Sequence, residues 1–217
     1  MKTAVLATAA AALITDGSVV MVGGFMGVGA PHRVLNALSE TVTKDLTLIV
    51  NDACRPGEGV GKLISNGQVK KLIVSHIGLN PEAQGKMISD ELDVELVPQG
   101  TLVERIRAGG FGLGGVLTET GVGTIVASGK QTVDIDGKTF LIEKPLRADF
   151  ALIAADRSDY VGNLDYSLTA HNFNPIMAMS ADVVIAEPQS IMPVGVIGPD
   201  EVKTPGVLVD HLIARPV

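Results

Sequence analysis

The sequence predicts an α/β protein with a mostly parallel open sheet, flanking helices and a small β-hairpin insertion. Short β-branched apolar runs alternate with helix-forming segments, as in parallel sheets that are buried on both faces. Hydrophobic residues make up 46% of the 217 residues and aromatic residues only 3%, which is typical of closely packed aliphatic strands and helices. No Ser/Pro-rich linker divides the chain, so we expect one domain over residues 1–217.

The first half alternates strands and helices. Strands are expected at residues 18–22, 46–50, 71–75 and 94–97. Helices are expected at residues 31–38, 59–65, 81–88 and 101–108. Right-handed crossovers then bring the carboxyl ends of these strands to one edge of the sheet, where we expect the functional residues.

The second half changes pattern at a glycine-rich stretch, 109–115. Residues 110–115 satisfy G-x-G-x-x-G, but a helix precedes them where a nucleotide fingerprint needs a strand. Asp136-Gly137 between two β-branched runs predicts a hairpin inside an insertion at 124–143. Buried strands return at 150–154 and 183–186, and the loop between them carries a histidine and two asparagines: His171, Asn172 and Asn174.

The alanine-rich stretch 4–14 has the length of a signal-peptide core. Leu6, Ala10 and Leu13 fall at helical spacing, however. Cleavage after this stretch would also make the next strand the new N-terminus of the chain. We therefore expect a first helix packed on the sheet. No later stretch approaches the roughly 18 apolar residues that span a membrane.

Charge and cysteine content restrict the partners and the compartment. The net charge of −7 argues against a nucleic-acid partner, and no dense basic run is present. The single cysteine, Cys54, excludes an internal disulfide framework and favours a reducing cytoplasm. The four histidines show no metal-ligand spacing, so no metal site is expected.

The most informative stretch is 16–31, in which an apolar strand runs into a glycine loop and Pro31 begins a helix. Glycines at 23, 24, 27 and 29 allow tight turns and a close approach of backbone N–H groups to an anion or a carbonyl oxygen. The simpler alternative is a tight strand-to-helix turn.

Residues 16–31 resemble the signature of the family I (3-oxoacid) coenzyme A transferases, in their A-type or alpha chain. Asp-Gly, three apolar residues, Gly-Gly-Phe and Gly-Ala-Pro fall at that family's spacing. Further similarity covers essentially the whole chain, at 46–52, 97–110, 121–124, 145–149, 172–175 and 204–206.

The resemblance implies chemistry on two chains. In this family the nucleophile that attacks the acyl-CoA is a glutamate, in a Ser-Glu-Asn-Gly segment of the B-type subunit. The string is absent here, and the nearest match, 65–67, is Ser-Asn-Gly without a carboxylate. The resemblance therefore implies a hetero-oligomer with a B-type subunit. Its substrates would be a CoA thioester and a short-chain acid of the acetoacetate, acetate, butyrate or succinate class, with no permanently bound cofactor.

The same resemblance places Asn51 and Gln99 at the substrate, where neutral amide donors stabilise an oxyanion. Gly24 and Gly27 would add backbone N–H groups, and Phe25 an apolar wall. The alternatives are an asparagine turn or cap for Asn51, a helix-flanking surface residue for Gln99 and a core side chain for Phe25.

Other candidates near this stretch have weaker support. Cys54 is expected to be a small buried residue, and Glu58 a solvated loop residue rather than the nucleophile. Residues 52–59 are expected to set substrate selectivity. Within them, Arg55 is either a carboxylate partner or an exposed loop residue. His32 is expected beside the glycine loop or at the surface.

Two other classes of function compete with the transferase. A metabolite-binding or regulatory α/β domain would keep the scaffold without chemistry. A sugar-phosphate isomerase would need an acid/base pair and a basic phosphate cluster, which we do not find. An interface with a second chain would draw on the apolar stretches 111–116 and 191–197.

Overall fold

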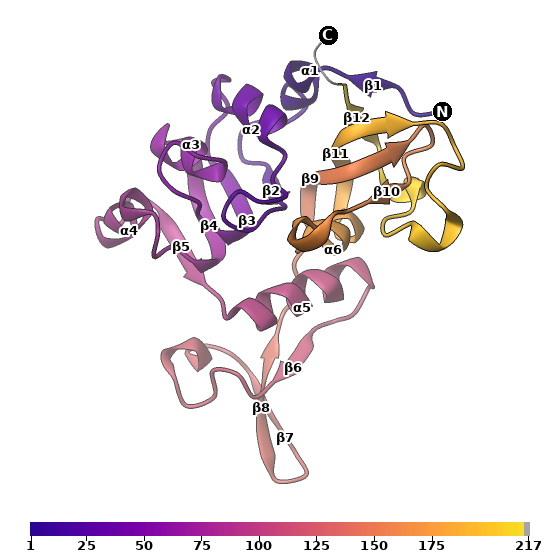
Figure 1. The fold of residues 1–217 in the computed structure, drawn as a ribbon. Coiled ribbons are helices and arrows are strands. Elements are labelled where there is room, and N and C mark those ends of the chain that lie inside the picture. The colour runs from indigo at the N-terminus through magenta and orange to yellow at the C-terminus, as the bar shows by residue number, and fades with distance from the viewer. Residues whose placement is uncertain (215–217) are drawn as a thin grey trace.

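The structure is a computed structural model and describes residues 1–214. Its main sheet follows the order β1-β12-β11-β9-β2-β3-β4-β5, with every neighbouring pair on this path parallel, while β10 pairs antiparallel with β9. The strands are β1 (Ala4–Val5), β2 (Val19–Val22), β3 (Leu46–Asp52), β4 (Val69–His76), β5 (Asp93–Leu96), β9 (Ala148–Asp159), β10 (Leu164–Asp165), β11 (Ala181–Met192) and β12 (His211–Ile213). The expected mostly parallel open sheet is confirmed (Figure 1).

Helices cover both faces of this sheet. They are α1 (Ala7–Ala11), α2 (His32–Ser39), α3 (Val60–Ser65), α4 (Pro81–Ile88), α5 (Gln99–Gly110) and α6 (Asn174–Met179). Val22 packs in one buried cluster with α1–α4, whereas its neighbour Met21 packs in a second cluster with Leu102 of α5 and Met177 of α6. Successive strand residues point to opposite faces, so each β-branched run serves two apolar cores.

The four expected crossover helices are present, and α4 has the expected bounds. The side chain of Asn80 begins α4 by accepting a hydrogen bond from the N–H of Ala83 at 2.9 Å. Helix α5 begins two residues earlier than expected and therefore includes Gln99 in its first turn.

The N-terminal helix is shorter than the sequence predicts. Ala4–Val5 forms β1, which pairs with β12, and α1 spans only Ala7–Ala11. Ala10 and Ala11 are fully buried, whereas Leu6 and Leu13 are exposed. The small alanines, rather than a leucine stripe, let the helix pack closely against its neighbours.

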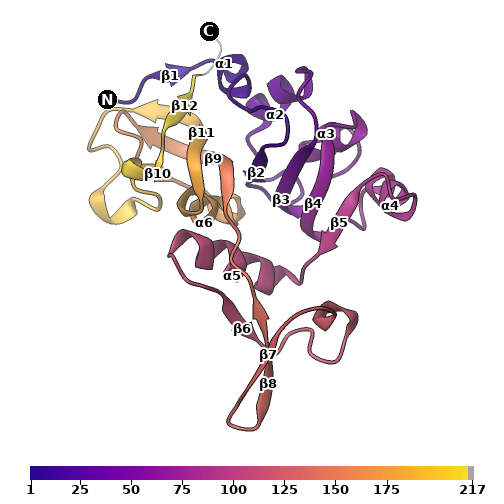
Figure 2. The ribbon, with the colours of Figure 1, turned by 180° about the vertical axis from the view of Figure 1, so that it is seen from behind.

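The expected hairpin is confirmed and belongs to a separate small sheet. Its strands are β6 (Val116–Thr118), β7 (Thr132–Ile135) and β8 (Lys138–Glu143), in the order β6-β8-β7. Asp136 and Gly137 connect β7 to β8 with φ of 50° and 76°, as a two-residue hairpin turn requires. The insertion begins at β6 rather than at 124. It extends from α5 away from the main sheet in both views (Figures 1 and 2).

Within residues 1–214 we find no helix that combines the length and apolar character needed to cross a membrane.

Candidate active site

The glycine loop after β2 is a miniature hairpin at the carboxyl edge of the sheet. Phe25 and Val28 exchange two backbone hydrogen bonds, both 2.9 Å long. Met26 and Gly27 form its tip with φ of 51° and 80°, in the left-handed region that glycine tolerates best. Phe25, Met26 and Val28 are 48%, 40% and 50% exposed, so the hairpin presents three apolar side chains to its surroundings.

Two asparagines from the other half of the chain hold the base of this hairpin. Asn172 Oδ1 accepts the N–H of Gly24 at 3.1 Å, and Asn174 Nδ2 donates to the carbonyl of Gly29 at 3.0 Å. A Cβ built on Gly23 would lie 1.7 Å from Oδ1 of the fully buried Asn174. Glycine is therefore required at 23 by close approach.

The two expected backbone donors, the N–H groups of Gly24 and Gly27, differ in what they contact. The N–H of Gly24 is already engaged by Asn172. The N–H of Gly27 has no oxygen partner among residues 1–214 and faces the thiol of Cys54. Gly27 is thus the expected donor that is not committed to another oxygen within the described chain.

The two amides predicted from the sequence lie in contact. Gln99 Nε2 donates to Asn51 Oδ1 at 2.6 Å, and Asn51 Nδ2 donates to Asp52 Oδ2 at 3.1 Å. Asn51 lies near the end of β3 and is 2% exposed, whereas Gln99 is exposed at the start of α5. Each amide nitrogen carries two hydrogens, and these bonds use one of each. One N–H on each side chain is left to donate elsewhere.

Ser75 and Asp52 support this pair, and the sequence alone does not single them out. Ser75 Oγ, from β4, donates to the backbone carbonyl of Asn51 at 2.6 Å. Asp52 Oδ2 also accepts the N–H of Met26 at 2.9 Å, and Oδ1 accepts the N–H of Cys54 at 3.0 Å. The strand order places β2, β3 and β4 side by side, which is the information that a single sequence lacks.

Cys54 lies behind the glycine loop in an unusual backbone conformation, with φ of 52°. Burial, together with the charge of Asp52, raises the pKa of its thiol from 9.0 to about 11. The N–H groups of Gly27 and Val60 oppose that rise in pKa. The thiol is therefore protonated at neutral pH, which argues against a thiolate nucleophile.

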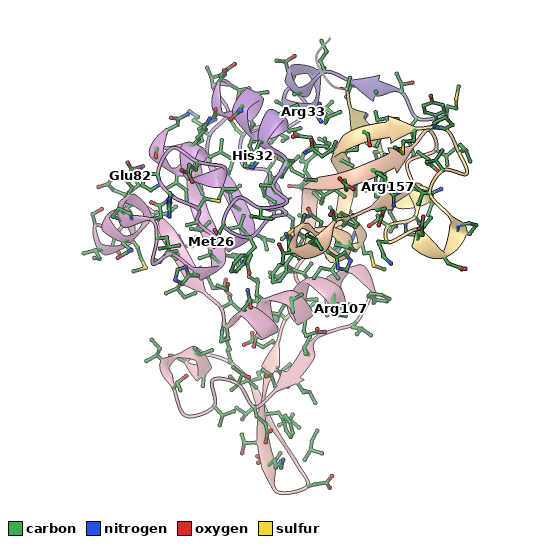
Figure 3. The ribbon with its side chains drawn as sticks, viewed as in Figure 1. Met26, His32, Arg33, Glu82, Arg107 and Arg157 are labelled. Atoms are coloured by element: carbon green, nitrogen blue, oxygen red, sulfur yellow. The ribbon has the colours of Figure 1, made fainter. Side chains whose placement is uncertain are left out.

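Two sizeable hollows adjoin the loop, besides a space of only about 10 Å³ beneath its glycines. The larger, about 460 Å³, is a groove between the loop, α2 and the residues before α3, and it includes His32, Glu58 and Lys62. The smaller, about 170 Å³, is lined by Met26, Cys54, Arg55 and Glu58. A ring nitrogen of His32 lies 2.9 Å from the carbonyl oxygen of Gly27, so this histidine contacts the loop as well as beginning α2. Figure 3 labels Met26 and His32 on this half of the molecule.

The charged loop residues around these hollows are open to solvent. Arg55 and Glu58 are both exposed, and Arg55 has no ion-pair partner among residues 1–214. In the part of the chain that the structure describes, no three histidine, cysteine, aspartate or glutamate side chains gather as a metal site.

An open parallel sheet with a glycine hairpin and two coupled amides at its carboxyl edge defines an α/β protein suited to bind a carbonyl or carboxylate oxygen. Comparison with known proteins identifies the family. Residues 3–215 match the family model described as coenzyme A transferase, and the chain belongs to this family.

Named relatives agree with this assignment. The chain is 57% identical over 198 residues to the alpha subunit of the acetate CoA-transferase of Escherichia coli K12, covering 91% of this chain and 90% of that one. It is 50% identical over 201 residues to the acetoacetyl-CoA:acetate/butyrate CoA transferase alpha subunit of Clostridium acetobutylicum, covering 93% and 92%. The family resemblance seen in the sequence is confirmed.

Solved structures share the fold. An acyl-CoA transferase of E. coli O157:H7, in a thioester complex with CoA, superposes with a TM-score of 0.89 at 22% identity. The match covers 99% of this chain but 47% of that one, so this chain spans about half its length. Glutaconate coenzyme A-transferase of Acidaminococcus fermentans gives 0.83 at 18% identity, covering 98% and 75%.

Proposed function

We propose that residues 1–217 form the A-type subunit of a heteromeric short-chain CoA-transferase. The enzyme moves CoA between an acyl-CoA and a carboxylic acid of the acetoacetate, acetate, butyrate or succinate class. The observation that carries the site assignment is the Gln99–Asn51 hydrogen bond beside the glycine hairpin, since it orients two neutral amides at one edge of the sheet.

The chemistry needs a nucleophilic carboxylate, which we assign to a glutamate of the B-type subunit. That carboxylate attacks the thioester carbonyl and expels the CoA thiolate, which leaves a mixed anhydride. The thiolate then attacks the glutamyl carbonyl, which releases the first acid and leaves a glutamyl-CoA thioester. The incoming acid reverses both steps and regenerates the glutamate. Each step passes through a tetrahedral oxyanion.

This chain's part is to stabilise that oxyanion. The remaining N–H of Asn51 and that of Gln99 are donors held in place before the charge develops. Removing one such donor typically costs about 10²–10³ in rate. Phe25 forms an apolar wall beside them, which lowers the local dielectric constant and strengthens the hydrogen bonds.

The carboxylates near these amides are poor candidates for the nucleophile. Asp52 is 6% exposed and accepts three hydrogen bonds from the described part of this chain. Glu58 is exposed on a loop between two glycines, Gly57 and Gly59. This arrangement supports a nucleophile that comes from the B-type subunit.

This chain has exposed apolar side chains that the B-type subunit would cover. Phe25 on the glycine hairpin and Phe111 and Leu113 after α5 are 48%, 57% and 56% exposed. In the second expected stretch, Val194 and Val196 are exposed as well. The proposal includes no permanently bound cofactor. It places the enzyme in the cytoplasm, in keeping with a single unpaired cysteine.

The test is reconstitution. This chain and its B-type partner are purified separately, mixed, and assayed for CoA transfer from acetyl-CoA, butyryl-CoA and succinyl-CoA to acetoacetate and acetate. We expect turnover only in the mixture. Full activity of this chain alone would contradict the proposal, and metabolite binding without transfer by the mixture would favour the regulatory alternative.

A further inference from the structure

Asp52 ties together three segments of the site. Its carboxylate accepts the N–H of Met26 at the tip of the glycine hairpin, the side-chain amide of Asn51, and the N–H of Cys54. The distances are 2.9, 3.1 and 3.0 Å, all within the ordinary hydrogen-bond range. Asp52 is only 6% exposed, so its carboxylate receives its hydrogen bonds from the protein rather than from solvent.

The partners of this carboxylate among residues 1–214 are all N–H groups, which can only donate. The ionised form is acceptor-only and therefore matches the three N–H groups. Asn51 in turn can keep only one orientation of its amide, because Nδ2 faces Asp52 and Oδ1 receives Gln99. Reversing the Asn51 amide would place its oxygen against the Asp52 carboxylate, so that two acceptors face each other. It would also place its NH₂ group against that of Gln99, so that two donors face each other.

A continuous chain of hydrogen bonds therefore runs from the hairpin tip to the second amide, in the order Met26, Asp52, Asn51, Gln99. The geometry points to Asp52 as the positioning residue of the active site: it fixes the glycine hairpin against β3 and sets the orientation in which Asn51 and Gln99 present their remaining N–H groups. This inference rests on the proposed CoA transfer and extends it to a residue that does not touch substrate.

Asparagine cannot replace Asp52 without loss, although it has the same shape. In one orientation its NH₂ group faces the N–H of Cys54, and in the other it faces the donors of Met26 and Asn51. Either way a donor meets a donor, and a buried N–H loses its acceptor. The expected consequence is a shifted hairpin and a disordered amide pair.

Another buried aspartate of this protein, Asp159, supplies a matched control. Asp159 is 1% exposed and accepts two backbone N–H groups, from Val161 and Asn163, and the side-chain amide of Asn163. It is the last residue of β9, and these partners follow it directly in the chain, so none of them belongs to the glycine hairpin or the amide pair. Asp159→Asn therefore breaks a hydrogen-bond set of the same composition without touching the hairpin.

The experiment compares Asp52→Asn, Asp159→Asn, Gln99→Ala and the double variant Asp52→Asn/Gln99→Ala, each mixed with the wild-type B-type subunit. Asp52→Asn is expected to lower kcat by about 10- to 100-fold, with KM within about threefold, because a misplaced donor weakens the transition state. Asp159→Asn is expected to keep kcat within about twofold, even where its melting temperature falls as much as that of Asp52→Asn.

The double variant distinguishes positioning from general destabilisation. If Asp52 acts through the amide pair, the double variant is expected to lose clearly less kcat than the product of the two single losses. Losses that multiply, or equal effects of Asp52→Asn and Asp159→Asn on kcat, would overturn the inference.

We call the hydrogen bonds from the N–H groups of Met26 and Cys54 to Asp52 the tether. Amide hydrogen exchange on the wild-type chain tests it without any substitution. The N–H of Met26 is expected to exchange slowly although its side chain is 40% exposed, and that of Cys54 likewise. Exchange of Met26 at the rate of a free peptide would contradict the tether, whether or not Asp52→Asn folds. Absence of transfer by the wild-type pair would refute the proposed function instead, and exchange would still decide on the tether.

Discussion

Substitution of Gln99 probes the proposed oxyanion donors with little disturbance of the fold. The side chain is exposed and, among residues 1–214, makes one hydrogen bond, to Asn51 Oδ1 at 2.6 Å. Loss of that bond in Gln99→Ala should cost at most about 0.5–1.5 kcal/mol of folding free energy. Loss of the free N–H removes a donor from the transition state, which corresponds to about 2.7–4 kcal/mol, or about 10²–10³ in kcat.

Gln99→Glu sharpens the test because it keeps the size of the side chain and removes the donor. A carboxylate at this position faces Asn51 Oδ1 as acceptor against acceptor, and its charge opposes the developing oxyanion. We therefore expect Gln99→Glu to lose at least as much kcat as Gln99→Ala. If Gln99 only packed beside the substrate, the glutamate would be the milder change.

The assay is steady-state CoA transfer by the reconstituted pair, with the melting temperature of each variant measured in parallel. Gln131→Ala, which removes an exposed glutamine on the β insertion, is the matched control and should keep wild-type kcat. A Gln99→Glu enzyme with kcat within threefold of wild type would refute the donor role.

The remaining predictions concern the thiol, the loop packing and the exposed glutamate. The rate of Cys54 alkylation should rise with pH around a midpoint near 11, above the ordinary 9.0, because burial and Asp52 disfavour the thiolate; a midpoint at or below 9 would contradict this. Gly23→Ala forces a Cβ to 1.7 Å from Asn174 Oδ1 and should lower the free energy of unfolding by about 1–3 kcal/mol in urea denaturation. Gly85→Ala, in α4 with open space around it, should raise the same quantity by about 0.5–1 kcal/mol, and the opposite order would contradict the packing. Glu58→Ala should keep near-normal turnover in the transfer assay, whereas its complete loss would make Glu58 the nucleophile.

Local signals in the sequence sufficed for most of the fold. The Asp136-Gly137 hairpin needs left-handed residues at both turn positions, and that pair supplies them at φ of 50° and 76°. The long β-branched runs and Pro81 marked strands and helix starts in the same way. By contrast, β1 and β12 have two and three residues, too few for any periodicity to show.

The contacts around the candidate site residues were predicted only in part, because they are long-range. Asn51 and Gln99 are 48 residues apart and were found through the family resemblance, while their hydrogen bond depends on the order of β3, β4 and β5. The donor at Gly24 is engaged by Asn172, 148 residues away. Nothing in the sequence distinguishes Asp52 from an ordinary loop acid, since its three donors converge only after the sheet has formed.

The central claim is that this chain supplies the donors while the B-type subunit supplies the nucleophile. Intact-mass measurement of both chains, after brief incubation of the reconstituted pair with acyl-CoA and no acceptor acid, tests it most directly. We predict a CoA adduct on the B-type chain and unmodified mass for this chain, with adduct formation slowed in Gln99→Glu. A CoA or acyl adduct on this chain, or adduct formation on it without its partner, would contradict the account.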